Sequence, residues 1–315
     1  GQPVTLWARS EEVAGAIRDT RHNPRYITGI QLPEAISATH DLELACVDAD
    51  VIVMGTPSQA VRSAADDFKG LCKPDAAVVS LAKGLERGSL LRMTEVLEEV
   101  LGDRSRLAVL SGPNHAEEVA AGIPTASVVA AYDEQVGLSL RELFCTPAFR
   151  VYTNPDVVGV ELAGASKNVI AVGAGICDGL SFGDNAKAAL MTRGLAEMAR
   201  LGSKKGANPL TYSGLAGMGD LIATCCSRHS RNRALGEHIG RGGTVDSYRE
   251  TTNMVAEGAT SCVTVDEMGH DVGLEMPITH RVRAVLHEGE SLAEAAKALM
   301  GRDTTDELHG FDLVE

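Results

Sequence analysis

Alternation of short apolar segments with segments of helical spacing, in the first half of the chain, restricts the fold more than any other feature. The apolar segments are near-continuous, a pattern typical of strands covered on both faces. They are VTLWA (4–8), DVIVMGT (50–56), AAVVSLA (76–82), RLAVLSG (106–112) and TASVVAA (125–131). Between two of them, LLRMTEVLEEVLG (90–102) has helical spacing and ends in glycine. This alternation predicts an α/β fold with a Rossmann-like, doubly wound, mostly parallel sheet.

The character of the sequence changes after Asn154-Pro155. From Val157 onward the chain is rich in Ala, Gly, Leu and Met, and AALMTRGLAEMARLGSKKG (188–206) has the spacing of an amphipathic helix. Because the residue before a proline leaves the helical region, we place a domain boundary at this dipeptide. The sequence therefore predicts a dinucleotide-binding domain over residues 1–154 and an all-α substrate domain over residues 155–315.

Charge and cysteine usage exclude several classes of partner. The net charge of −14 and the 3% aromatic content argue against nucleic acid. Seven scattered cysteines without a C-x-x-C pair indicate reduced thiols, and they support neither a metal site nor a disulfide framework. The sequence shows no export signal and no apolar run of about 20 residues, the length that a membrane helix needs. We therefore expect a soluble, cytoplasmic protein that is not membrane-embedded.

A sheet of this type usually carries G-x-G-x-x-G in the turn after its first strand, and this sequence has no such turn. The chain passes from Gly1-Gln2-Pro3 directly into VTLWAR, which ends in a polar residue where the ribose of a dinucleotide would lie. We interpret VTLWAR as the second strand, with a strand, a glycine turn and a helix of roughly 25 residues absent upstream. The alternative is a complete chain that anchors a ligand without the turn.

One lysine and one asparagine interrupt the small and apolar run ELAGASKNVIAVGAG (161–175). If residues 159–175 form a helix, the positions one turn away from Lys167 are small or aliphatic, so that a ligand can approach the ammonium group. These positions are Ala163, Gly164, Ile170 and Ala171. Partial burial lowers the pKa of such a lysine towards the range useful for proton transfer. The alternative is a lysine at a helix edge whose ammonium group reaches water.

The segment GLAGMGDLIATCCSRHSRNRALG (214–236) adds a carboxylate and several arginines. Asp220 lies four residues before Thr224, so both side chains face one side of a helix that starts there. Arginines gather in SRHSRNR (227–233), and guanidinium groups suit phosphate oxygens. The structural alternatives are a helix cap for Asp220 and a solvated loop for the arginines.

These segments and several others resemble the bacterial NAD(P)-dependent glycerol-3-phosphate dehydrogenase family. In chain order they are VTLWAR, GTPSQAVR, SLAKGLE, SGPNHAEEVAAGIPT, ELAGASKNVIAVGAGICDGLSFGDNAKAALMTRGLAEM, GLAGMGDLIATC and SRNRALG. The resemblance covers nearly the whole chain after the absent first strand. The family's Gly-rich loop and its small-residue–aromatic pair have no counterpart in this sequence.

The resemblance implies roles for individual residues, with Lys167 as the proton acceptor. The implied substrate-binding residues are Lys83, Gly112, Asn114, Lys167, Asn168, Asp220, Thr224, Ser230, Arg231 and Asn232. The implied cofactor-binding residues are Arg9, Lys83, Ala116, Arg231, Val255 and Glu257. The implied reaction interconverts sn-glycerol 3-phosphate and dihydroxyacetone phosphate with NAD(P)(H). The resemblance also implies a homodimer that supplies glycerol phosphate for glycerophospholipid synthesis.

The end of the first apolar segment bears on cofactor preference. An acidic residue there would favour NAD through the ribose hydroxyls, whereas Arg9 can accommodate the 2′-phosphate of NADP. We therefore expect NADP in preference to NAD. The alternative is that Arg9 stacks on the adenine and serves either cofactor.

Two other functions stay open at this point. Other dehydrogenases of the ketopantoate reductase and 6-phosphogluconate types pair a Rossmann domain with a helical domain and a catalytic lysine. The SRNR segment after GMGD favours a small phosphorylated triol over their substrates. A catalytically inactive chain that acts as a binding module is the second alternative, because the glycine turn is absent.

Overall fold

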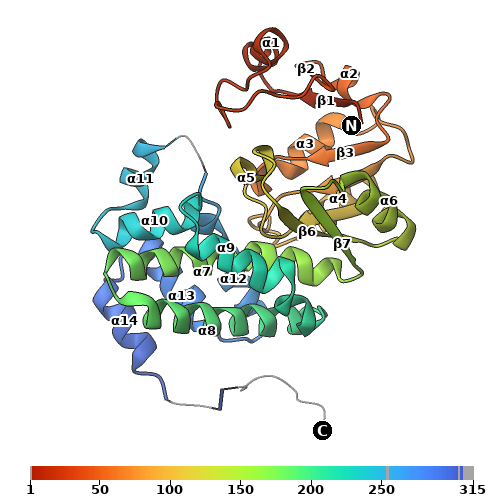
Figure 1. The fold of residues 1–315 in the computed structure, drawn as a ribbon. Coiled ribbons are helices and arrows are strands. Elements are labelled where there is room, and N and C mark those ends of the chain that lie inside the picture. Colours follow the sequence, from red (N-terminus) through yellow and green to blue (C-terminus); the bar gives the residue numbers. More distant parts are fainter. Residues whose placement is uncertain (1, 253–254, 304–305, 308–315) are drawn as a thin grey trace.

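Each of the five apolar segments forms a strand in the computed structural model, which describes residues 2–252, 255–303 and 306–307. Seven strands lie in two sheets, of order β1-β2 and β3-β4-β5-β6-β7. Their bounds are β1 Val4–Trp7, β2 Ile36–Thr39, β3 Val51–Met54, β4 Ala77–Ser80, β5 Leu107–Ser111, β6 Thr125–Ala131 and β7 Phe149–Asn154. All neighbouring pairs are parallel except β5 and β6. The predicted Rossmann-like sheet is confirmed (Figure 1).

The two sheets do not pair with each other within the described residues. Strand β1 runs in register with β2, from Val4 opposite Ile36 to Trp7 opposite Thr39. Strand β3 pairs with β4 and with no other described strand. One edge of β1 and one edge of β3 are therefore not paired with any described strand. The predicted absent strand lies outside the described residues and stays a prediction.

Helices cover the sheets of this first domain. They are α1 Glu11–Thr20, α2 Leu42–Cys46, η1 Ser58–Ala60, α3 Val61–Phe68, α4 Met93–Leu101, α5 Ala116–Ala120 and α6 Glu134–Phe144. Helix α4 confirms the helical spacing of residues 90–102, although it begins three residues later than that segment. The reason is local, since Leu90 has φ of 58° and the N-cap Arg92 has an extended ψ of 158°, neither of which belongs to a right-handed helix. Gly102, with φ of 82°, ends it.

The second domain is helical, as the sequence predicts. Its elements are α7 Val157–Gly179, α8 Gly183–Lys204, η2 Pro209–Ser213, η3 Leu215–Gly219, α9 Asp220–Cys226, α10 Arg231–Gly240, α11 Val245–Thr251, α12 Gly258–Asp271, α13 Pro277–Arg283, η4 Ala284–Glu288 and α14 Leu292–Met300. Helix α7 is central, because it packs against α8, α9, α10 and α12 and also against β5 (Figure 1). The division of the chain at residues 154 and 155 stays a prediction.

Helix α7 also corrects one expectation from the sequence. An 18-residue window of this 23-residue helix has a mean hydropathy of 1.3, so α7 is long and apolar enough to cross a membrane and the expectation of no such segment was wrong. In the structure 94% of this apolar window is buried inside the protein. The composition of α7 therefore reflects a core helix surrounded by other helices on nearly all sides.

Glycines bring α7 and α10 into backbone contact. A Cβ atom on Gly175 would lie 2.0 Å from the carbonyl oxygen of Arg233, and one on Gly236 would lie 1.9 Å from that of Val172. One turn further along, Gly179 and Gly240 face each other in the same way. Both helices carry a Gly-x-x-x-Gly spacing, which places the small residues on one face. This contact fixes the position of α10 relative to α7.

Substitution of Gly236 tests the contact. The methyl group of Gly236→Ala would overlap a backbone carbonyl that cannot rotate away, so we expect a loss of about 3 kcal/mol in the free energy of unfolding. The measurement is urea denaturation followed by circular dichroism. Gly15→Ala in α1 is the control, since its Cβ would meet nothing nearer than 3.7 Å. A Gly236→Ala protein as stable as the wild type would show that the two backbones are not in contact.

Candidate active site

One buried carboxylate holds two lysines. Asp220, only 2% exposed, accepts a hydrogen bond from Lys167 Nζ on Oδ1 at 2.7 Å and one from Lys83 Nζ on Oδ2 at 2.7 Å. Burial alone would raise the pKa of Asp220, but the two ammonium groups outweigh it and hold the pKa below its ordinary value. The three groups together carry one net positive charge.

Lys167 lies in the middle of α7 and is 4% exposed. Its Nζ also donates to Thr224 Oγ1 at 2.6 Å. Helix α9 begins at Asp220 and brings Thr224 to the same side one turn later, as the spacing predicts. Burial lowers the pKa of Lys167 to about 8; Asp220 opposes this shift and Lys83 adds to it. The alternative of a lysine reaching solvent at a helix edge was wrong.

Lys83 reaches the same carboxylate from the loop that follows β4. Its Nζ donates to the carbonyl oxygen of Gly112 at 3.0 Å and to Asn114 Oδ1 at 3.1 Å. Asn114 is itself oriented by Ser127, whose Oγ accepts from Asn114 Nδ2 at 3.0 Å. Gly112 has φ of 135°, and a Cβ there would lie 3.0 Å from the Cα of Ser127. A glycine is therefore required at this turn.

Two asparagines extend the network towards α10 and α12. Asn168 Nδ2 donates to the carbonyl oxygen of Lys83 at 3.0 Å, and its Oδ1 accepts from Asn232 Nδ2 at 2.8 Å. Asn232 Oδ1 in turn accepts from the backbone N–H of Gly258 at 2.8 Å. Eight of the predicted substrate residues thus form one connected cluster. They are Lys83, Gly112, Asn114, Lys167, Asn168, Asp220, Thr224 and Asn232.

The remaining substrate-side residues lie at the start of α10. Ser230 is the N-cap of this helix, and its Oγ accepts from the backbone N–H of Arg233 at 3.1 Å. The side chain of Arg231 is exposed next to this cap. Arg233 instead pairs with Asp178 at 2.6 Å, so the arginines of this segment do not act together. Asp220 is not a helix cap, because its carboxylate binds the two lysines.

The predicted cofactor residues come from both domains. Arg9 follows β1 and is exposed, Ala116 is the first residue of α5, and Val255 is 51% exposed. Glu257 accepts hydrogen bonds from the backbone N–H of Ser58 at 3.2 Å and from its Oγ at 2.8 Å. This contact joins the segment before α12 to the loop that follows β3.

A nicotinamide dinucleotide fits this edge of the sheet. Strands β3 and β4 are parallel, so their carboxyl ends lie together, and open α/β sheets bind ligands in the crevice outside those ends. Thr56 follows β3, and its buried Oγ1 has no partner among the described residues. Lys83 follows β4. A ligand at this edge would therefore meet a polar atom available for bonding and the lysine cluster.

Sequence reasoning missed His115, which follows Asn114. Its Nε2 is buried and has no hydrogen-bond partner within the described ranges. Burial lowers the pKa of His115, and the charge on Lys167 adds to this shift. No motif in the sequence marks this histidine; only its place beside Asn114 does. Among the described residues no group of histidine, cysteine or acidic side chains is arranged to hold a metal ion.

A buried lysine of lowered pKa beside the carboxyl ends of a Rossmann-like sheet is the arrangement expected of a nicotinamide-dependent dehydrogenase. Two family models match the chain, the N-terminus of NAD-dependent glycerol-3-phosphate dehydrogenase over residues 1–137 and its C-terminus over residues 156–297. The chain belongs to the NAD-dependent glycerol-3-phosphate dehydrogenase family.

Individual relatives agree with this family assignment. The glycerol-3-phosphate dehydrogenase (NAD(P)+) of Streptomyces coelicolor is 49% identical, over 98% of this chain and 92% of the relative. The protein of the same name from Corynebacterium glutamicum strain R is also 49% identical, over 96% of this chain and 92% of the relative. The crystal structure of glycerol-3-phosphate dehydrogenase from Coxiella burnetii superposes with a TM-score of 0.91 at 37% identity, covering 96% of this chain and 92% of that one.

Removal of the shared carboxylate should change the titration of Lys167. In Asp220→Asn the opposing negative charge is lost while burial and the charge of Lys83 remain, so the pKa of Lys167 should fall below 8. The measurement is a pH titration by NMR of protein labelled with ¹³C at the lysine ε carbons, with the signal assigned from Lys167→Met. Asp50→Asn is the control, because Asp50 pairs with the surface residue Lys73. An unchanged Lys167 titration in Asp220→Asn would contradict the assigned contact.

Proposed function

We propose that this protein interconverts sn-glycerol 3-phosphate and dihydroxyacetone phosphate with NAD(P)(H), with Lys167 as the general base and acid. One observation carries the proposal: a lysine with a pKa lowered to about 8 lies in the interior, held by Asp220 and Thr224. Near neutral pH such a group exchanges a proton readily in both directions. The family assignment supports this choice over the ketopantoate reductase and 6-phosphogluconate types.

The amino group of Lys167 has one hydrogen-bonding position left for a substrate oxygen. An ammonium group has three N–H donors, and within the described part of the chain Asp220 and Thr224 take two of them. The third position is open to the C2 oxygen of the substrate. In oxidation the neutral amine accepts the proton of the C2 hydroxyl, and in reduction the ammonium group returns it. The Asp220 carboxylate compensates the positive charge that Lys167 gains.

Other residues would hold the two ligands. When bound, the nicotinamide cofactor supplies the hydride acceptor for oxidation and the hydride donor for reduction. Arg9, Ala116, Val255 and Glu257 would hold it on the sheet side, and Thr56 adds an unpartnered buried hydroxyl there. Arg231 and Asn232 at the start of α10 would bind the substrate phosphate, because guanidinium and amide N–H groups suit phosphate oxygens.

The two directions should depend on pH with opposite sign. Oxidation requires neutral Lys167, so its kcat should rise as the pH increases through about 8, whereas the kcat of reduction should fall over the same range. Initial rates measured between pH 6 and pH 10 in both directions check this. Lys167→Met should lower kcat on the order of 10³-fold and remove the dependence of kcat on pH near 8.

One control variant and two contrary results complete this test of Lys167. Lys73→Met changes an exposed lysine that pairs with Asp50, and it should leave both profiles in place. Lys167→Met with wild-type turnover would overturn the role of Lys167. A folded wild-type chain without turnover in either direction would instead support the alternative of an inactive binding module.

Cofactor preference should follow Arg9. Because a 2′-phosphate carries negative charge, Arg9→Glu should raise the KM for NADP on the order of 10-fold and change the KM for NAD little. Steady-state kinetics with each cofactor measure this ratio. Arg104→Glu, which alters an exposed ion pair with Glu98, is the control. An equal rise for both cofactors would favour the alternative in which Arg9 stacks on the adenine.

We further propose that the enzyme works in the cytoplasm as a homodimer that supplies glycerol phosphate for glycerophospholipid synthesis. All seven cysteines are free thiols, which is consistent with a reducing compartment. The dimer and the metabolic role rest on the family resemblance. Sedimentation equilibrium of the purified chain measures the assembly state.

A further inference from the structure

The loop that carries Lys83 is attached to α7 at both of its ends. This loop spans residues 81–92, between β4 and α4. At its start the carbonyl oxygen of Lys83 accepts from Asn168 at 3.0 Å. At its end Glu161 accepts from Arg92 Nη1 at 2.5 Å and from the backbone N–H of Thr94 at 2.8 Å. The same helix that carries Lys167 therefore holds the loop that carries its partner lysine.

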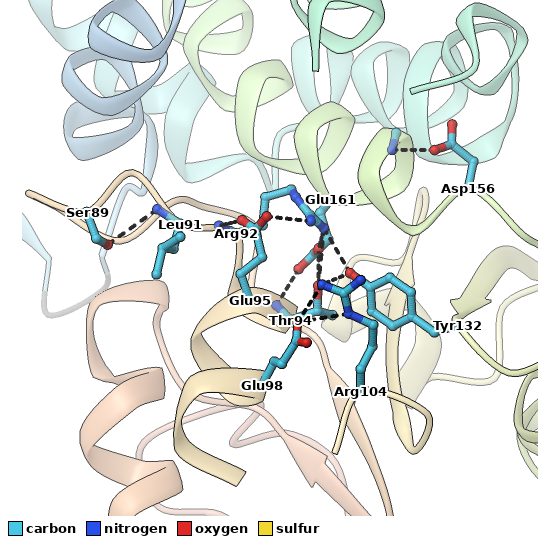
Figure 2. Close-up of polar contacts among 11 residues, drawn as sticks. Ser89, Leu91, Arg92, Thr94, Glu95, Glu98, Arg104, Tyr132, Asp156 and Glu161 are labelled. Carbon is cyan, nitrogen blue, oxygen red and sulfur yellow. Dashed lines mark hydrogen bonds and ion pairs between the residues drawn. The ribbon is translucent and has the colours of Figure 1, made fainter. Parts of the chain in front are cut away.

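The attachment at Glu161 is a buried ionic network (Figure 2). Glu161 and Arg92 are each 5% exposed. Figure 2 shows Thr94, Glu95 and Tyr132 around them, and Thr94 Oγ1 donates to Glu161 Oε2 at 2.6 Å. Arg92 Nη2 donates to Glu95 Oε1 at 2.8 Å and Arg92 Nη1 donates to the Tyr132 hydroxyl at 3.3 Å. A buried pair with several hydrogen bonds has a well-defined geometry, although it is weak evidence for stability.

The contacts of α7 with the first domain lie on one helical face. Glu161, Gly164 and Asn168 are spaced i, i+3 and i+7, which places them in a row about 10 Å long. Between the two attachments, a Cβ on Gly164 would lie 3.2 Å from Ser111 Oγ and 3.4 Å from Lys83 Cγ. The Lys83 side chain therefore packs against α7 between the two attachment points, Glu161 and Asn168.

The interior of the loop has little freedom to absorb a displacement. The carbonyl oxygen of Leu85 accepts from Gln59 Nε2 at 2.7 Å, and the backbone N–H of Arg87 donates to Gln59 Oε1 at 3.1 Å. Glu86 is paired with Arg62 at 2.8 Å. These bonds join the loop to η1 and α3 as one unit, and Glu161 and Asn168 attach that unit to α7.

We propose that Glu161 is a positioning residue which, through Arg92 and Thr94, holds the 81–92 loop in register with α7 and so keeps the Lys83 ammonium group at Asp220 beside Lys167. Only the expected effect of Glu161 on catalysis rests on the proposed function; its effect on the position of Lys83 does not. Neither Glu161 nor Arg92 touches the two lysines.

The charged groups around Lys167 predict the direction in which its pKa changes when the loop is displaced. The titratable groups that act on it are Asp220 and Cys225 from α9 and Lys83 from the loop, and its own charge acts on His115 before α5. Lys83 lowers the pKa of Lys167. If the loop loosens, Lys83 withdraws and water enters, and both changes raise the pKa of Lys167.

Glu161→Gln tests the proposal, because it keeps the shape and one acceptor oxygen but removes the charge that orients Arg92. By ¹³C NMR of cofactor-free protein, the Lys167 titration should move upward by about half a pH unit or more. In turnover, kcat should fall on the order of 10-fold, with its pH limb displaced in the same direction. Glu98→Gln is the control. Glu98 lies on α4, as Thr94 does, but it pairs with Arg104 at the surface, so its substitution should change neither the Lys167 titration nor kcat.

The outcomes separate a positioning role from a merely structural one. A lower melting temperature with an unmoved Lys167 titration and unchanged kcat would overturn the proposal. If Glu161→Gln does not fold, Thr94→Val is read by the same criteria, since it is nearly isosteric and removes the hydroxyl that bonds to Glu161, Arg92 and Tyr132 while leaving the charges of Glu161 and Arg92 in place. Because the NMR titration needs no turnover, it remains decisive even if the wild-type chain proves inactive and the proposed function fails.

Discussion

Asp220 binds two ammonium groups in the interior of the protein, one on each carboxylate oxygen, and the rest of the site depends on this arrangement. Without the carboxylate, two like charges would face each other in a medium of low polarity, and the structure would have to neutralise or expel one of them. With it, Lys167 keeps a pKa of about 8 despite its burial, and Lys83 is paired with the second carboxylate oxygen beside it. Asp220 is also the first residue of α9, so its two ion pairs hold the start of this helix in place.

Helix α7 is the frame on which these charges are arranged. Three of its buried polar residues, Glu161, Lys167 and Asn168, each bind a different segment: the start of α4, the start of α9, and the Lys83 loop together with α10. Most of the other residues of the helix are small or apolar, which allows neighbouring helices to approach on nearly all sides. A single helix therefore determines the relative positions of groups that lie up to about 150 residues apart in the chain.

Much of this could be predicted from the sequence. The strands follow from continuous apolar runs, and the lysine, the asparagine and the Asp220–Thr224 spacing are visible as polar residues in apolar or helical contexts. The strand order was only partly predicted: the absence of a first strand was expected from the missing glycine turn, but the strands that pair with one another are not visible in local patterns. The arginine cluster was only partly informative, since Arg233 pairs with Asp178, a partner 55 residues away. Glu161 was present in the same apolar run as Lys167, but its partner Arg92 could be recognised only once the fold had brought them together.

The glycine contact between α7 and α10 has a consequence for how this protein can vary over evolutionary time. Side chains in a core can be exchanged for others of similar volume, because neighbouring side chains adjust. Gly175, Gly179, Gly236 and Gly240 have no such latitude, because main chain meets main chain there. The start of α10, with Ser230 and Asn232, is thus held by a contact that does not respond to repacking elsewhere. Lineages of this protein could therefore diversify most of their hydrophobic interior while keeping the entrance to α10 at an almost constant distance from Asn168.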